Sequence, residues 1–115
     1  MKTTLLALLL LLSGSALAVD IEFQGTPKSR TLLTKDGAVR ETLDARESQK
    51  YALKITRDGP QYYWASRGDV ALLKVTNGEF TTYIAPSGEG YIRIANGAYV
   101  EHLTVEMTSV TYYGK

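Results

Sequence analysis

The sequence contains no cysteine, one histidine, one tryptophan and only three prolines. Without cysteine the chain cannot form a disulfide, a thiol nucleophile, an iron–sulfur cluster, a thiolate zinc site or a lipid-modified N-terminal cysteine. Without a second histidine it cannot build a two-histidine metal site within one chain. No cofactor or metal is therefore implied, and stability has to come from apolar burial and strand pairing.

An excess of charge of one sign is also missing. The 115 residues carry 13 basic and 12 acidic side chains, and one of the basic residues, Lys2, belongs to the N-terminal segment. Without Lys2, the basic and acidic side chains of residues 19–115 balance. A neutral domain lacks the basic surface with which proteins bind nucleic acid or anionic membranes, so we predict neither partner. No apolar run approaches the roughly 20 residues that span a bilayer.

The first 18 residues have the features of a secretory signal peptide. These features are Lys2, an apolar run over residues 5–12, and the small-residue site Ala16-Leu17-Ala18. The sequence predicts cleavage before Val19 and secretion, either to the periplasm or outside the cell. The remaining residues, 19–115, are enough for a single β-domain.

Beyond residue 18, short apolar or β-branched runs alternate with turn residues, which is the pattern of antiparallel strands. The sequence predicts an all-β fold, a small antiparallel sandwich or open barrel of about seven or eight strands. Strands are expected over residues 20–24, 30–34, 38–42, 49–57 and 99–107, with a four-stranded meander over 61–94. Residues 43–48 form a helical turn or a loop, and residues 108–113 continue the last strand or form another one.

The register of the meander depends on three predicted turns, at residues 67–69, 77–78 and 86–90. With these turns, alternate side chains sort into two faces. The apolar face carries Tyr63, Ala65, Ala71, Leu73, Val75, Phe80, Ile84, Ile92 and Ile94. The other face gathers Tyr62, Trp64, Lys74, Tyr83, Tyr91 and Arg93, together with Val70 and Leu72.

The aromatic and basic face is the predicted binding surface. Tyrosine and tryptophan can stack on sugars or anchor a protein, and lysine and arginine can bind a carboxylate or sulfate. The alternative is that this face is an inner layer of the sandwich, covered by the N-terminal strands. An exposed edge strand could also pair two copies of the chain.

Two registers are open for the strand after Asn96-Gly97. A two-residue turn pairs Ile92 with Glu101, which buries a charge. A three-residue turn pairs Arg93 with Glu101 but turns His102 inward. We favour the second register because it forms a cross-strand ion pair.

Two loops and the single histidine are further candidates. Arg67-Gly68-Asp69 is the tripeptide that integrins bind, although glycine and aspartate are also ordinary turn residues. The loop that contains Ser87 and Glu89 is rich in glycine but lacks the lysine and helix of a P-loop. His102 could pair with Glu101 or Glu106 in acid–base chemistry, but their spacing does not favour a catalytic site.

Several segments resemble a group of small secreted proteins of unassigned function. They read YYWASR at 62–67, GEFTTYIAP at 78–86, GEGYIR at 88–93, YVEHL at 99–103 and TYYG at 111–114. A second resemblance is to the periplasmic inhibitors of c-type lysozyme, which are β-barrels. It rests on Trp64 followed by Gly68-Asp69 and Ala71, and on Ser87-Gly88 followed by Tyr91.

The leading hypothesis is a secreted, non-enzymatic module that binds a protein or glycan through the aromatic and basic face and its hairpin tips. The resemblance to lysozyme inhibitors implies an alternative, in which the loop 87–90 enters the cleft of a cell-wall hydrolase. A small hydrolase that uses His102 is the third hypothesis.

Overall fold

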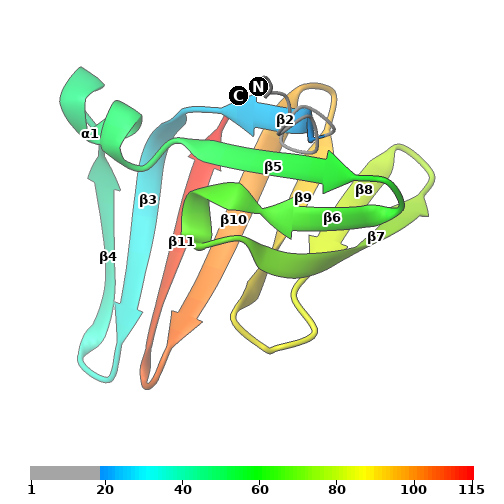
Figure 1. The fold of residues 1–115 in the computed structure, drawn as a ribbon. Helices are drawn as coiled ribbons and strands as arrows, with labels where there is room; N and C mark the ends of the chain where they lie inside the picture. The colour runs from blue at the N-terminus through cyan, green and yellow to red at the C-terminus, as the bar shows by residue number, and fades with distance from the viewer. Residues whose placement is uncertain (1–18) are drawn as a thin grey trace, which may run out of the picture.

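The computed structural model describes residues 19–115, which form one antiparallel sheet of ten strands curled into a half-barrel (Figure 1). The strand order is β2-β5-β6-β7-β8-β9-β10-β11-β3-β4. The all-β antiparallel prediction is confirmed, whereas the expected number of about seven or eight strands is too low. The segment predicted to be a signal peptide, residues 1–18, lies outside the described residues.

The three N-terminal segments that were predicted as strands are all paired in the sheet. β2 (Asp20–Gly25) pairs with β5 (Leu53–Asp58) and is one edge of the sheet. Only Thr26 separates β2 from β3 (Pro27–Thr34), which pairs with β4 (Gly37–Thr42) and with β11 (Thr108–Gly114). One continuous stretch of chain therefore contributes to both ends of the curled sheet.

The helical turn expected near residues 43–48 is the helix α1 (Ala45–Lys50). Asp44 and Glu47 form a capping box in which each carboxylate accepts the backbone N–H of the other residue, at 2.8 and 3.2 Å. These two bonds satisfy donors that the first turn leaves free. Because α1 extends to Lys50, β5 begins later than the predicted strand over 49–57.

The four-stranded meander is confirmed, but all three of its predicted turns are wrong in detail. Its strands are β6 (Gln61–Trp64), β7 (Val70–Asn77), β8 (Phe80–Ile84) and β9 (Gly90–Ala95). The first connection contains the 3₁₀ helix η2 (Ala65–Arg67) and pairs Trp64 with Val70 instead of Leu72. The second turn is Gly78-Glu79 and pairs Val75 with Thr82 instead of Phe80. Both shifts are of two residues, so every side chain in β6, β7 and β8 keeps its predicted face, whereas Ala65 lies in η2 and not in a strand.

The third turn is one residue shorter than predicted, and this reverses which side chains of β9 face the core. The Ala85 N–H donates to the Gly90 carbonyl at 3.0 Å, which leaves residues 86–89 as the loop. Tyr83 consequently pairs with Ile92 and not with Arg93. Since side chains alternate along a strand, the shift turns Ile92 towards the core and moves Tyr91 and Arg93 to the outer face.

The register favoured for the last strands is also wrong. β10 (Ala98–Val105) follows a two-residue turn at Asn96-Gly97 and pairs Ile92 with Glu101. Glu101 is therefore buried, with 0% of its surface exposed. The ion pair used to choose the other register does not form, because Glu101 has a partner on η2 that strand pairing alone could not reveal.

The core lies inside the curl, where β5, β6 and β7 cross in front of β9 and β10 (Figure 1). The sheet bends within β7, whose first residues pair with β6 and whose remaining residues pair with β8. The buried core residues are Leu53, Ile55, Trp64, Leu72, Tyr83, Ala85, Ile92 and Tyr99. Their burial is the main source of stability.

Gly90 allows two parts of this core to approach closely. A Cβ atom at this position would lie 1.9 Å from the His102 carbonyl oxygen and 3.1 Å from the Trp64 indole. Only glycine fits there. The absent side chain lets the ring of Trp64 reach the inner surface of β9 and β10.

Candidate functional site

The six residues of the predicted binding face do not share one face. Tyr62, Trp64, Lys74 and Tyr83 point into the half-barrel, whereas Tyr91 and Arg93 lie on its outer face. Trp64 and Tyr83 are 0% and 3% exposed. The prediction of a single open aromatic platform is therefore wrong. The alternative of an inner packing layer describes Trp64 and Tyr83, whereas Tyr62 is half-buried and Lys74 remains exposed at the rim.

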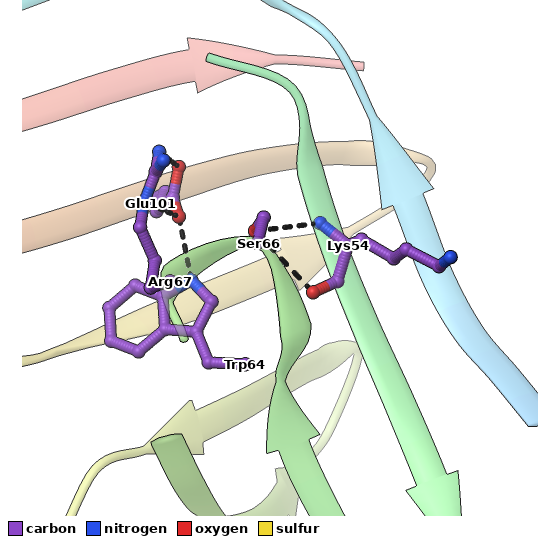
Figure 2. A network of polar contacts seen from close by, with 5 residues as sticks. All are labelled: Lys54, Trp64, Ser66, Arg67 and Glu101. Carbon is purple, nitrogen blue, oxygen red and sulfur yellow. Dashed lines mark hydrogen bonds and ion pairs between the residues drawn. The ribbon is translucent and has the colours of Figure 1, made fainter. Parts of the chain in front are cut away.

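Trp64 and the loop residue Arg67 meet at the buried carboxylate of Glu101 (Figure 2). The indole Nε1–H donates to one carboxylate oxygen at 2.7 Å. The Arg67 guanidinium donates to both oxygens, at 3.1 and 2.9 Å. Bidentate charge-assisted bonds of this kind are strong and fix geometry.

The local structure around η2 brings Arg67 to this position. Ser66 Oγ accepts the Lys54 N–H at 3.0 Å, which fastens η2 to β5 (Figure 2). Gly68 adopts a left-handed conformation with φ of 83°, and the Asp69 N–H donates to the Trp64 carbonyl. The Arg67 side chain is directed inward, only 19% exposed, so the tripeptide is not displayed as an integrin ligand would be.

Burial governs the electrostatics of Glu101. It raises the pKa of this carboxyl above its ordinary value, and the Arg67 charge and the Trp64 hydrogen bond oppose the increase. The Arg67 guanidinium also lies over the Tyr112 ring, 5.4 Å from its centre, and Tyr51 stacks on Tyr112 at 5.3 Å. The rings of Tyr112 and Tyr51 therefore pack around Arg67, while its Nε and Nη2 donors are both occupied by Glu101. The arrangement is that of an internal clamp between η2 and β10.

A second polar cluster contains the other inner residues of the predicted face. The register between β2 and β5 shifts between Ile21 and Phe23, and this bulge leaves Glu22 without a cross-strand partner. Its carboxylate accepts bonds from Lys74 Nζ at 2.8 Å and from the Tyr83 hydroxyl at 2.7 Å. Lys74 also lies 5.2 Å from the centre of the Tyr62 ring. Bulges commonly redirect a side chain in this way.

The charge of Lys74 sets the titration of this cluster. Burial by itself raises the pKa of Glu22. The hydrogen bonds from Lys74 and Tyr83 and the Lys74 charge together lower it by more than burial raises it, so the pKa of Glu22 lies below its ordinary value. Glu22 therefore contributes stability that is fully present above the unfolded-state pKa, near 4.5. This contribution is lost as the pH falls through the lower, folded-state pKa.

We expect the Glu22→Gln variant to lose on the order of 1 kcal/mol of unfolding free energy at neutral pH. The difference from the native protein should disappear in strongly acidic solution, because the native carboxyl is then protonated as well. Denaturant unfolding of both proteins across the acidic pH range measures this. A difference that stays constant with pH would contradict the assigned role of Lys74.

The remaining loop candidates lie on the surface. Ser87 and Glu89 are exposed in the β8–β9 loop. The loop is braced at its base, because the Gly88 N–H donates to the Ala85 carbonyl and the Thr104 N–H donates to the Glu89 carbonyl. Asp69 is exposed beside η2.

His102 does not form the acid–base pair considered from the sequence. Its ring lies between Thr111 Oγ1 at 3.0 Å and Thr104 Oγ1 at 3.4 Å, and it stacks on Tyr91. Glu101 points to the opposite face of β10.

Within residues 19–115, no three histidine or acidic side chains are placed to hold a metal ion. Among the same residues, no helix has the length and apolar character needed to cross a membrane.

The outer face of β7, β8 and β9 carries an apolar surface. Most of its side chains were predicted on the apolar face of the meander, opposite to Tyr91 and Arg93. Leu73 pairs with Ile84, and Ile84 pairs with Tyr91, so these side chains are neighbours on one face. We call the following set the outer patch: Leu73, Val75, Phe80, Ile84, Tyr91 and Arg93. Its five apolar members are between 37% and 59% exposed. The alternation of β7 and β8 was predicted correctly, but no sequence signal showed which face would be covered.

Two hollows flank a ridge on the outer patch. The ridge is formed by Phe80 and Arg93, whose guanidinium lies 5.8 Å from the centre of the Phe80 ring. One hollow, of about 270 Å³, is lined by Val75, Asn77, Phe80, Thr82, Ile84 and Arg93. The other, of about 300 Å³, extends over β10 and β11 and is lined by residues that include Ala98, Val100 and Tyr113.

Comparison with known proteins adds no relative to these observations. No family model, curated protein or solved structure matches the chain.

Proposed function

We propose that the protein is a non-enzymatic interaction module that binds a partner protein through the outer patch. The observation that carries the proposal is the exposure of five large apolar side chains on three adjacent strands. Apolar side chains that cluster on one face of a folded protein commonly mark an interaction site, whereas scattered ones do not. The opposite face of the same strands already supplies the core.

The composition of the outer patch fits a protein partner. Aromatic residues and arginine are enriched in the centres of protein interfaces, and charged residues of other kinds are depleted there. The outer patch holds two aromatic side chains and a single charged one, Arg93. Arg93 is held in place by the Phe80 ring and by a 3.4 Å hydrogen bond to Thr82 Oγ1. A preorganised cation of this kind can bind a carboxylate at little entropic cost.

A glycan partner fits the surface less well. Stacking on a sugar requires an accessible aromatic face, and the Trp64 and Tyr83 rings are buried. Tyr91 is accessible on the outer face, but His102 already covers one side of its ring at a centroid distance of 5.2 Å. We therefore assign the outer patch to a protein surface.

Site-specific photocrosslinking in the producing cell tests the proposal. A benzophenone side chain at Ile84, in the middle of the outer patch, should give a discrete protein adduct. The same probe at Lys54, an exposed strand position remote from the outer patch, should give none. The adduct at position 84 should disappear when Val75→Asp is introduced. Equal adduct yields at the two positions would overturn the proposal.

A further inference from the structure

We infer that the partner of the outer patch is a second copy of this chain, packed face to face about a two-fold axis. This inference rests on the proposed function and names its partner. A symmetric interface has to present a projection and a matching recess on the same surface. The outer patch has both, because the Phe80–Arg93 ridge stands between hollows of about 270 and 300 Å³. The ridge of one copy can therefore occupy a hollow of the other.

Charge favours the same arrangement. Within residues 19–115, neither Arg93 nor Glu79 takes part in an ion pair. Glu79 is exposed in the turn between β7 and β8, next to Phe80 at the end of the outer patch. Two copies bring two such arginines and two such glutamates to one interface. Each arginine can then pair with the glutamate of the other copy, and no net charge is buried.

The exposed apolar area of the outer patch is by itself too small for a standard dimer interface, so the contact also has to cover the larger hollow, over β10 and β11. Five large apolar side chains that are roughly half exposed offer on the order of 400 Å². A standard interface buries about 800 Å² on each partner. The contact must therefore continue from the outer patch across β10 to Val100 and Tyr113, which line the larger hollow.

Pairing through the free edge of β4 is the competing arrangement for two copies. It would satisfy the open backbone groups of β4 but leave the outer patch in water. Arg40 and Glu41 lie on this strand, and charges on an edge strand oppose pairing with another chain. The two arrangements depend on different residues and can be separated by substitution.

Analytical ultracentrifugation of the purified protein tests the inference. We expect a dimer at micromolar concentration, and a dissociation constant at least about 30-fold weaker in Val75→Lys. The matched control is Val39→Lys, because Val39 is similarly exposed on a strand but lies on β4, and its dimer should be unaffected. Arg93→Glu should weaken the dimer, and Arg93→Glu combined with Glu79→Arg should restore it.

Two outcomes would overturn the inference. One is a native protein that remains monomeric, and the other is a dimer whose dissociation constant is unchanged by Val75→Lys, whether or not Val39→Lys weakens it. A monomeric protein whose residue 84 still crosslinks to a different protein would refute the second copy and keep the proposed function. A monomer without such an adduct would refute both.

Discussion

Replacing Trp64 by alanine is expected to lower the free energy of unfolding by about 3–5 kcal/mol. The indole is fully buried at the centre of the core and fills the space that Gly90 leaves open. Its Nε1–H also satisfies one oxygen of the buried Glu101 carboxylate. The truncation therefore creates a cavity and removes a hydrogen bond from a buried charge, and both effects destabilise the fold.

Denaturant unfolding followed by far-ultraviolet circular dichroism measures this loss. Val39→Ala is the control, because Val39 is an apolar strand residue of β4 that is 56% exposed and lies outside both the core and the outer patch. Its loss should stay below about 1 kcal/mol, as for most exposed positions. If Trp64→Ala unfolded at the same denaturant concentration as the native protein, the indole would have to lie outside the core.

Replacing Arg67 by methionine is expected to cost about 3–5 kcal/mol, because it leaves the Glu101 carboxylate buried without its counter-ion. Methionine keeps much of the volume of the arginine stem, so lost packing contributes little. The cost should become smaller in acidic solution. Burial already raises the pKa of Glu101, and the protonated side chain carries no charge that needs Arg67.

A second substitution separates the charge from the loop conformation. In the double variant Arg67→Met with Glu101→Gln, the amide oxygen can still accept the Trp64 N–H bond, and no buried charge remains. Most of the lost stability should return. If the double variant were as unstable as Arg67→Met alone, Arg67 would act through the conformation of η2 and not through the ion pair.

The alternation of side chains could be predicted through β8 but not beyond it. Errors of two residues in the first two turns left the faces of β6, β7 and β8 unchanged, because the side-chain period of a strand is two. A one-residue error in the next loop was enough to place Tyr91 and Arg93 on the wrong face. Glycine-rich loops specify their length weakly, since glycine accommodates several turn geometries.

The register of β10 could not be predicted because the deciding contact is between distant segments. A buried glutamate is costly unless it is paired, which favoured the alternative register. The structure supplies the pair from Arg67, which was predicted as a turn residue or as part of an integrin-binding tripeptide and not as a partner of Glu101. The Trp64–Glu101–Arg67 clamp depends on residues 34 and 37 positions apart, and no local pattern connects them.

Local sequence patterns also could not show which face of the sheet would form the core. Both faces of β7 carry aliphatic residues, so hydrophobic periodicity did not distinguish the core from the outer patch. Glu22 is a similar case, because only the bulge in β2 directs its side chain to Lys74 and Tyr83. A bulge adds one residue without a distinctive sequence, so alternation cannot locate it.

The pairing of β3 with β11 has a consequence for how this protein matures. Partners in this ladder are about 80 residues apart, and contacts between such distant segments slow the search for the native state. Until the C-terminal strand arrives, both β3 and β10 offer open backbone edges to neighbouring chains. Nascent molecules therefore depend on β11, which is synthesised after the other nine strands described, for protection against aggregation.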